Sequence, residues 1–534
     1  MQRSVGSTNR YDVIVIGSGP GGASAALPLV ESGARVLMLE VGGWVPRGPW
    51  NLDPGCAAML SPCYSKRTRY EARTDTGRHR VGQFQCVGGQ SVFYGAVAFR
   101  YRAEDFSPPS EVLGSSGACW PFAYDELEPW YGIAEELLGV SGDPLADPTE
   151  PRRTKSPARA PSLTGTGEAL HRAARALGLH PFQPPLAITR SPNRVTQGCN
   201  ACGRCDGHPC AVSAKGDAAV MVASLVARGM ELRTRTAALR LIASGDRVTG
   251  VECLDLDTGK PITLRAGTMV VSGGTLATPH LLLSSSLQRL NPGGRVVGQY
   301  LTRHCNGVVV GCFRDPPGGG QVPFKEIAIH DFYFGHPARP ELSRVGNLQQ
   351  LSLPPGIVEQ QTPWPLRPVA RRLVPHLMGL IGITEDQPVA TNRVAVDPRR
   401  TDAWGRPILR VRHRYTARDR LARDLLAREA ARLLKTAGAS ITARRGIDTF
   451  SHALGTVRMG VDPRSSALDA AGRFRGLANL YVADGSALPT SAAVNPSLTI
   501  AANALRIGAG LAARRAGSFV QTAHQPLEAA HAAP

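Results

Sequence analysis

The feature that most constrains this chain is an apolar run broken by a glycine-rich turn near its N-terminus, residues 11–40. The pattern predicts a strand at Val13–Ile16, a tight turn at Gly17–Gly22, a helix at Ala23–Ser32 kinked by Pro28, and a second strand at Arg35–Leu39. Glycines in such a turn let the backbone approach a pyrophosphate, and the helix N-terminus presents N–H groups to it. Glu40 follows the second strand, where a carboxylate can hold ribose hydroxyls. The order of these parts predicts a dinucleotide site; a glycine turn without ligand is the alternative.

Length and charge exclude several classes of function. With 534 residues the chain can bury a large core, and we expect two joined domains. The net charge of +19 is spread along the sequence without a basic tract or interleaved aromatics, so no nucleic-acid partner is expected. No run of about 18 uncharged apolar residues exists, and the N-terminus has no apolar signal-peptide core. We therefore predict no transmembrane segment and a cytoplasmic location.

Hydrophobic periodicity predicts the remaining elements. Helices are expected at 124–138, 170–177, 218–229 and 419–437, and strands at 232–234, 238–243, 248–255, 261–265 and 268–272. The segment 362–387 is basic and apolar, which favours a helix packed on a sheet, with contact to a membrane surface as the alternative. The Ala-rich residues 516–534 are predicted to be disordered.

Four separated motifs carry a resemblance to a known family. They are GSGPGG with Glu40, GGQSVFYG at 88–95, VVSGGTLATPHLLL at 270–283, and a C-terminal block made of SHALGTVRMG at 451–460 and NLYVADGSALPTSAAVNPSLTI at 479–500. In this order they resemble the glucose–methanol–choline (GMC) FAD-dependent oxidoreductases over nearly the whole chain. The resemblance implies an α/β fold, in which a Rossmann-type FAD-binding domain is interleaved with a mixed-sheet α+β substrate domain. It is closest in motif to the branch that pairs His with Asn, which contains cholesterol oxidase-like, pyranose oxidase-like and sugar-acid dehydrogenase-like members.

The same resemblance implies a division of the chain and a set of cofactor contacts. Residues 10–100, 199–294 and 447–515 are expected to form the FAD-binding part, 101–198 and 295–446 the substrate part, and 516–534 the tail. FAD is expected to be held by Gly17, Gly19, Pro20, Gly21, Gly22, Glu40, Gly88, Gly89, Ser91, Tyr94, Gly95, Gly273, Gly274, Asp484, Gly485, Asn495, Pro496 and Thr499. Several members bind FAD covalently through a histidine at the position of Phe93, so here we predict non-covalent FAD.

Two residues of the C-terminal block suit alcohol oxidation, which needs a base for the hydroxyl proton and a polar group to hold the oxygen. His452 is the expected base, because the pKa of an imidazole lies near neutrality. Asn495 is expected to hold the oxygen and also to cap the helix predicted at 497–507, with Pro496 as its first residue. A buried structural histidine and a plain helix cap are the alternatives. Whether Glu385 and Asp386 reach the substrate pocket stays open.

Four cysteines at 199, 202, 205 and 210 form a separate motif. Their spacing resembles one edge of a ferredoxin-type iron–sulfur motif but departs from it at the fourth cysteine. Structural cysteines are favoured; an iron–sulfur cluster or a zinc site is the alternative.

Two other functions compete with alcohol oxidation. A flavin disulfide reductase would need a second GxGxxG and a redox CxxxxC, and neither is found. An iron–sulfur electron-transfer subunit would leave His452 and Asn495 unexplained. The expected substrate is a sugar, cyclitol or sterol-like alcohol, and oxygen, a quinone or a redox protein all stay open as the electron acceptor.

Overall fold

The computed structural model describes residues 10–189, 191, 198–320, 325–351, 353, 355–447 and 449–517. The predicted disordered tail lies outside this range from residue 518 onward. Among the described residues, every helix is too short or too polar to span a lipid bilayer.

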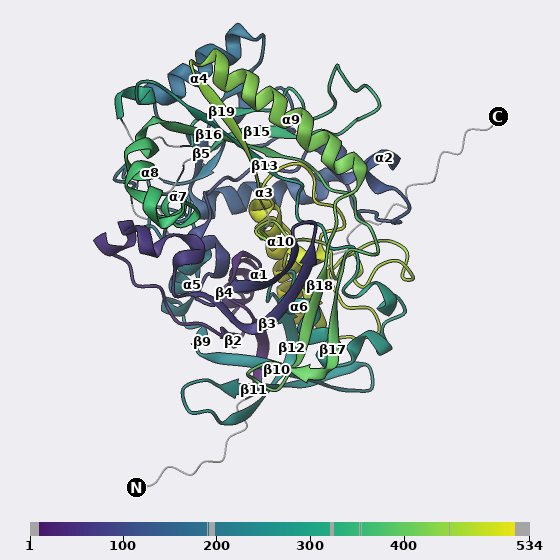
Figure 1. Cartoon of the computed structure of the whole chain (residues 1–534). Coiled ribbons are helices and arrows are strands. Elements are labelled where there is room, and N and C mark those ends of the chain that lie inside the picture. The colour runs from purple at the N-terminus through teal and green to yellow at the C-terminus, as the bar shows by residue number, and fades with distance from the viewer. Residues whose placement is uncertain are drawn as a thin grey trace, which may run out of the picture.

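A parallel sheet forms the lower half of the molecule (Figure 1). Its strands pair in the order β20, β12, β1, β2, β9, so that the last strand of the chain lies beside a strand from its middle. Their bounds are Leu480–Val482, Pro261–Val271, Arg10–Ile16, Val36–Leu39 and Glu231–Arg233. Residues 13–16 of β1 and all of β2 are apolar and buried, as expected for strands covered on both faces.

An antiparallel hairpin extends this sheet, formed by β10 (Thr236–Ser244) and β11 (Arg247–Asp255). The prediction of separate strands at 261–265 and 268–272 is wrong, because β12 runs through without a turn. Its first half pairs with β11 and its second half with β1 and β20. The strand predicted at 232–234 is β9 and belongs to the parallel sheet, where it pairs with β2.

Helices cover the parallel sheet. The first helix, α1 (Pro20–Glu31), continues through Pro28 and packs on α5 (Ala218–Ala227) and on the last helix, α10 (Ser497–Arg515). A Cβ at Gly508 would lie 2.3 Å from the carbonyl oxygen of Ala25, so α10 and α1 are in backbone contact. The remaining helices of this half are α3 (Tyr124–Leu138), which packs on α10, and α6 (Ala277–Ser284).

A second, antiparallel sheet lies in the upper half of the molecule (Figure 1). Its order is β19 (Ile441–Gly446), β13 (Gly307–Cys312), β16 (Leu377–Ile383), β15 (Asn347–Leu351), β14 (Ala328–Ile329) and β7 (Pro181–Phe182). Helix α9 (Ala417–Thr436) packs on β13 and β16 through a buried face of leucines, and α4 (Gly165–Ala176) packs beside it. Thr416 and Asp419 form a capping box, which is why α9 begins before the predicted residue 419.

Two smaller sheets complete the fold. One has the order β17 (Arg393–Thr401), β18 (Pro407–Arg412), β3 (Tyr64–Thr74) and β4 (Gly77–Phe84), and so joins an early segment to a late one. The other consists of β6 (Ala158–Arg159), β5 (Val140–Gly142) and β8 (Leu186–Ala187). The short helix α2 (Ser110–Leu113) lies between β4 and α3 in the sequence.

The segment 362–387 does not form the packed helix that the sequence favours. It divides into short turns, helix α8 (Arg367–Leu373) and strand β16, and follows helix α7 (Pro355–Gln361). No side chain of α8 is buried, and Trp364 just before it is 79% exposed. The apolar residues at and just before α8 are therefore exposed, whereas those of β16 are mostly buried, and contact of the exposed residues with a membrane surface stays a hypothesis.

Candidate active site

The glycine turn between β1 and α1 lies directly on the ends of two neighbouring strands. A Cβ at Gly17 would lie 2.4 Å from the carbonyl oxygen of Ser272, and one at Gly21 would lie 1.9 Å from that of Ala483. At Gly19, in contrast, a Cβ would meet nothing within 4 Å, and no side chain caps the helix. Gly17 and Gly21 are therefore packed against the protein backbone, whereas Gly19 borders open space. This open space fits a pyrophosphate at the N-terminus of α1.

Glu40 connects this turn to the second glycine turn of the sequence. Its carboxylate accepts hydrogen bonds from the backbone N–H of Ser18 (3.2 Å), the Ser18 hydroxyl (2.6 Å) and the N–H of Gly42 (2.9 Å). The N–H of Gly88 donates to the same Ser18 hydroxyl at 3.0 Å. A Cβ at Gly89 would lie 3.7 Å from the Cα of Gly19. Burial raises the pKa of Glu40, and these donors oppose that shift.

The turn at 88–95 is held by its own side chains. Ser91 accepts from the N–H of Ala218 (3.0 Å), and the Tyr94 hydroxyl donates to the carbonyl oxygen of Gly216 (2.6 Å). The Phe93 ring is buried and stacks on Phe84 with centroids 4.8 Å apart. The Tyr94 hydroxyl therefore forms its hydrogen bond with Gly216 of this chain. The Phe93 ring stands where several family members are expected to have the histidine that binds FAD covalently.

Asp484 lies directly after β20 and ties together two of the predicted cofactor segments. It accepts hydrogen bonds from Gly274 N–H (2.8 Å), the Thr278 hydroxyl, and both the N–H and hydroxyl of Ser486. Four bonds match the number of acceptor positions on a carboxylate. Asp484 therefore orients the backbone of both turns, while a Cβ at Gly274 would meet nothing within 4 Å.

The two expected catalytic residues come together between the sheets. Nε2 of His452 lies 3.5 Å from Nδ2 of Asn495, and Nδ1 of His452 lies 3.0 Å from Nδ1 of His304. Burial lowers the pKa of His452 well below its ordinary value, and the nearby His304 and Lys325 lower it further. The imidazole is therefore neutral at physiological pH and able to accept a proton.

Asn495 does not cap α10, as the sequence suggested. Pro496 occupies the N-cap position, and no side chain caps this helix. The Asn495 side chain instead accepts from Nε2 of Gln349 (2.8 Å) and faces His452. In the first turn of α10, the Thr499 hydroxyl lies 2.8 Å from that of Tyr131.

Strand β15 supplies a row of buried amides that sequence reasoning missed. Asn347 and Gln349 lie two residues apart on one strand, so they share a face of the sheet. Nε2 of Gln349 donates to Oδ1 of Asn347 at 3.0 Å, while its Oε1 has no partner within the described part of the chain. Three amides within the five-residue strand, Asn347, Gln349 and Gln350, were the available signal.

Glu385 and Asp386 are both buried behind the site. Asp386 accepts from the N–H groups of Arg303 (2.9 Å) and His304 (3.0 Å), and from the Ser491 hydroxyl (3.2 Å). Glu385 accepts from the N–H of Ala492 (3.0 Å). The two acids therefore hold the loops that carry His304 and Asn495.

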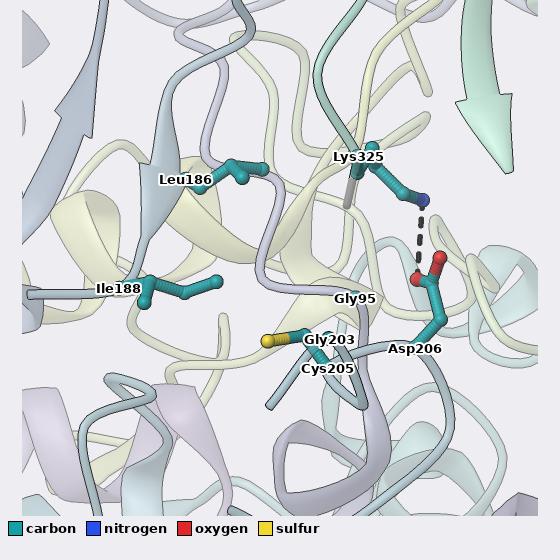
Figure 2. Close-up of a pocket in the computed structure, with 7 residues that line it drawn as sticks. All are labelled: Gly95, Leu186, Ile188, Gly203, Cys205, Asp206 and Lys325. Atoms are coloured by element: carbon teal, nitrogen blue, oxygen red, sulfur yellow. Dashed lines mark ion pairs between the residues drawn. The ribbon is translucent and has the colours of Figure 1, made fainter. Parts of the chain in front are cut away.

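A small pocket borders the Gly95 turn (Figure 2). Leu186 and Ile188 form its apolar side, and Lys325 reaches across to Asp206, with Nζ and Oδ1 3.2 Å apart. A Cβ at Gly95 would lie 2.0 Å from this Asp206 oxygen. Because Lys325 also lowers the pKa of His452, the pocket and the histidine lie within electrostatic reach of each other.

The cysteine segment 199–210 packs against this turn. Buried Lys215 donates to the carbonyl oxygens of Tyr94 (2.9 Å), Cys205 (3.1 Å) and His208 (2.7 Å), which fixes the segment on the turn. None of the eleven cysteines, all of which lie in the described part of the chain, forms a disulfide, and burial raises the pKa of Cys205 to about 12. Among the described residues no group of His, Cys, Asp and Glu side chains is arranged to hold a metal ion. The iron–sulfur hypothesis for Cys199, Cys202, Cys205 and Cys210 is not supported.

Comparison with known proteins identifies the class that this fold and site define. Family models described as GMC oxidoreductase match residues 11–306 and 388–504. The chain therefore belongs to the GMC oxidoreductases, flavoproteins that oxidise CH–OH groups.

Characterised relatives cover nearly the whole chain. Paromamine 6'-oxidase of Streptomyces fradiae is 34% identical over 93% of this chain and 90% of its own length. The 6'''-hydroxyparomomycin C oxidase of Streptomyces lividus is 34% identical over 95% and 92%. The 2-methyl-1,2-propanediol dehydrogenase of Mycolicibacterium austroafricanum is 30% identical over 94% and 95%.

Solved structures share the fold. Pyridoxine 4-oxidase from Mesorbium loti aligns with a TM-score of 0.66 at 18% identity, covering 93% of this chain and 98% of its own. A variant of formate oxidase from Aspergillus oryzae aligns with the same TM-score at 14% identity, covering 96% and 100%. The α/β fold with interleaved sheets that the sequence predicted is confirmed.

Proposed function

We propose that this chain oxidises the CH–OH group of a hydroxyl-rich small molecule, with His452 as the base and Asn495 holding the reacting oxygen. The observation that carries the proposal is the pair itself: the imidazole Nε2 and the amide Nδ2 face each other at 3.5 Å. A hydroxyl between them could give its proton to His452 while its oxygen accepts from Asn495. Both groups lie at the N-terminus of α10, whose positive end favours the negative charge that develops on the oxygen.

FAD fits the cradle described above, with the pyrophosphate at Gly19 and the N-terminus of α1, and with the ribose hydroxyls near Glu40. When bound, it supplies the acceptor for the hydride that leaves the carbon. The remaining predicted contacts at the 88–95 turn, Gly273, Gly274, Gly485 and the start of α10 would surround it.

The substrate class follows from the buried amides and from the relatives. The amides of Asn347 and Gln349 give the surroundings of Asn495 a polar character, which suits a polar substrate better than an apolar one. Two relatives carry the names of oxidases of paromamine and of a paromomycin, and one that of a diol dehydrogenase. These observations favour a sugar-like or polyol alcohol over a sterol. Oxygen, a quinone and a redox protein all stay open as the electron acceptor.

The mechanism is tested by the rate of flavin reduction after rapid mixing with an alcohol substrate. His452→Ala should slow reduction by about 10²–10⁴-fold, the usual size of a general-base contribution, while FAD stays bound. Asn495→Ala should slow it less, and the double variant should be non-additive, because both side chains act on one oxygen. His180→Ala, at an exposed histidine on another surface, is the matched control. Wild-type rates in His452→Ala would end the proposal.

The non-covalent state of FAD has its own test. Because Phe93 has no nucleophilic atom, acid precipitation of the purified protein should leave all the flavin in the supernatant. A yellow pellet after repeated washing would contradict this.

A further inference from the structure

We propose that His304 is a positioning residue that fixes His452 in one neutral tautomer, with the proton on Nδ1 and the lone pair on Nε2. Asn347 and Gln349 fix the amide of Asn495 from the opposite side. The proposal rests on the function above only for its consequence in catalysis, because the proton positions follow from the hydrogen bonds themselves.

The first chain of hydrogen bonds begins at the backbone carbonyl of Ser491. A carbonyl oxygen only accepts, so Nε2 of His304, 3.0 Å away, must carry a proton. Burial lowers the pKa of His304, so its ring is neutral and Nδ1 carries the lone pair. Nδ1 of His452 lies 3.0 Å from this lone pair and must therefore be the donor. It follows that Nε2 of His452 carries no proton.

The second chain begins at the backbone carbonyl of Ala493. It accepts from Nδ2 of Asn347, which leaves Oδ1 of Asn347 to accept from Nε2 of Gln349 at 3.0 Å. The same Gln349 nitrogen gives its second proton to Oδ1 of Asn495 at 2.8 Å. Nδ2 of Asn495 is thereby turned toward His452 as a donor. This chain independently requires a lone pair on Nε2 of His452.

Both chains start from carbonyls of one loop, two residues apart, and end on the same imidazole, the first at Nδ1 and the second at Nε2 of His452. The opposite tautomer of His452 would place two lone pairs against each other at 3.0 Å and an N–H against the amide N–H of Asn495. The supporting members of both chains are almost fully buried, with His304 1% exposed and Asn347 and Gln349 0%, while His452 and Asn495 are half-buried. In such a low-dielectric setting a reversed hydrogen bond is costly.

The backbone of His304 is held in a conformation that this residue type rarely adopts. Its φ of 58° is left-handed, its N–H donates to Asp386, and its carbonyl accepts from the Tyr415 hydroxyl at 2.8 Å. Such strain persists only where the surroundings impose it, and it is concentrated at functional sites. Here it directs the imidazole between His452 and Ser491.

The test compares two amide replacements that separate the two roles of the ring. In His304→Asn, the side-chain oxygen takes the place of Nδ1 and keeps the acceptor for His452; Asn also tolerates a left-handed φ. In His304→Gln, the amide nitrogen can reach the Ser491 carbonyl, but no acceptor stands at the Nδ1 position. FAD content and circular dichroism report whether each variant folds.

The direct readout is the two-bond ¹H–¹⁵N spectrum of histidine-labelled protein, with His452 assigned by its loss in His452→Asn. We expect a pure Nδ1–H tautomer in the wild type and in His304→Asn, and a mixture in His304→Gln. Flavin reduction should stay within about threefold of wild type in His304→Asn and fall about 10–100-fold in His304→Gln, the usual size for a residue that orients another.

A wild-type His452 protonated on Nε2 would overturn the proposal without any variant, as would a His304→Gln protein that keeps the pure tautomer. The two proposals fail on different measurements. Flavin reduction at the wild-type rate in His452→Ala would show that His452 is not the base, but it would leave the tautomer seen in the spectrum of the wild type unchanged.

Discussion

Glu385 shows how a single buried group can link stability to pH. Its Oε1 accepts from Ala492, and its Oε2 has no partner among the described residues. Burial, aided by the nearby carboxylate of Asp105 and opposed by Arg418 and Arg344, raises the pKa of Glu385 to about 8. The side chain is therefore a neutral acid in the folded protein over most of the physiological range.

This shift predicts the direction of a pH effect. An unfolded glutamate has a pKa of about 4.3, so between roughly pH 4 and pH 8 only the unfolded state loses the proton. The stability that Glu385 contributes is full below pH 4 and declines as the pH rises through 8. Glu385→Gln should therefore lose less free energy of unfolding than the wild type between pH 5 and pH 8.5, measured by urea denaturation. Parallel pH profiles for the two proteins would show that the pKa of Glu385 is not raised.

The candidate residues were predictable where a local motif marks them, while their catalytic roles stay predictions. His452 and Asn495 stand in a dense C-terminal block, and the structure brings them together. His304 stands in no motif, because its role depends on an atom contact with a residue 148 positions away. Gln349 was missed for the same reason. A sequence shows which side chains are present, but not which of them become hydrogen-bond partners in the folded protein.

At the scale of elements, the turn between β1 and α1 permits a matched pair of substitutions. Gly19→Ala adds a methyl group to open space at a φ of −68°, which alanine adopts freely. The variant should fold normally and bind FAD weakly, since the methyl group occupies the expected pyrophosphate position. Gly21→Ala would place its methyl group 1.9 Å from the carbonyl oxygen of Ala483, so this variant should destabilise the fold itself.

Thermal unfolding of the apoproteins and FAD titration separate the two effects. Gly19→Ala should keep the apoprotein Tm and lose affinity, whereas Gly21→Ala should lose both. Undiminished FAD affinity in Gly19→Ala would place the pyrophosphate elsewhere.

Elements were predictable from periodicity when they bury one continuous face. The buried leucines of α9 satisfy that condition, whereas β1 and β2 were predictable as short apolar runs that are buried on both faces. The break predicted within β12 is wrong because the strand changes partners without changing direction. The packed helix predicted in 362–387 is wrong because the apolar residues around α8 are exposed and those after it form the buried strand β16, a division that the local pattern does not reveal.

At the scale of the whole molecule, the pairing of distant segments was accessible only through the family resemblance. Strand β18 pairs with β3, more than 300 residues earlier, and β20 pairs with β12. Nothing in the composition of these strands specifies their partners, since the register depends on which faces are buried together. The predicted domain boundaries stay a prediction.

The backbone contacts of α1 have a consequence for the order in which the protein matures. Gly21 rests on Ala483 and Ala25 on Gly508, so the first helix is completed by residues that are synthesised more than 450 positions later. Throughout translation the nascent chain carries the glycine turn without the strand and helix that support it. The flavin site is therefore complete only after β20 and α10 have been synthesised, and a message truncated before β20 should yield a chain that cannot retain flavin.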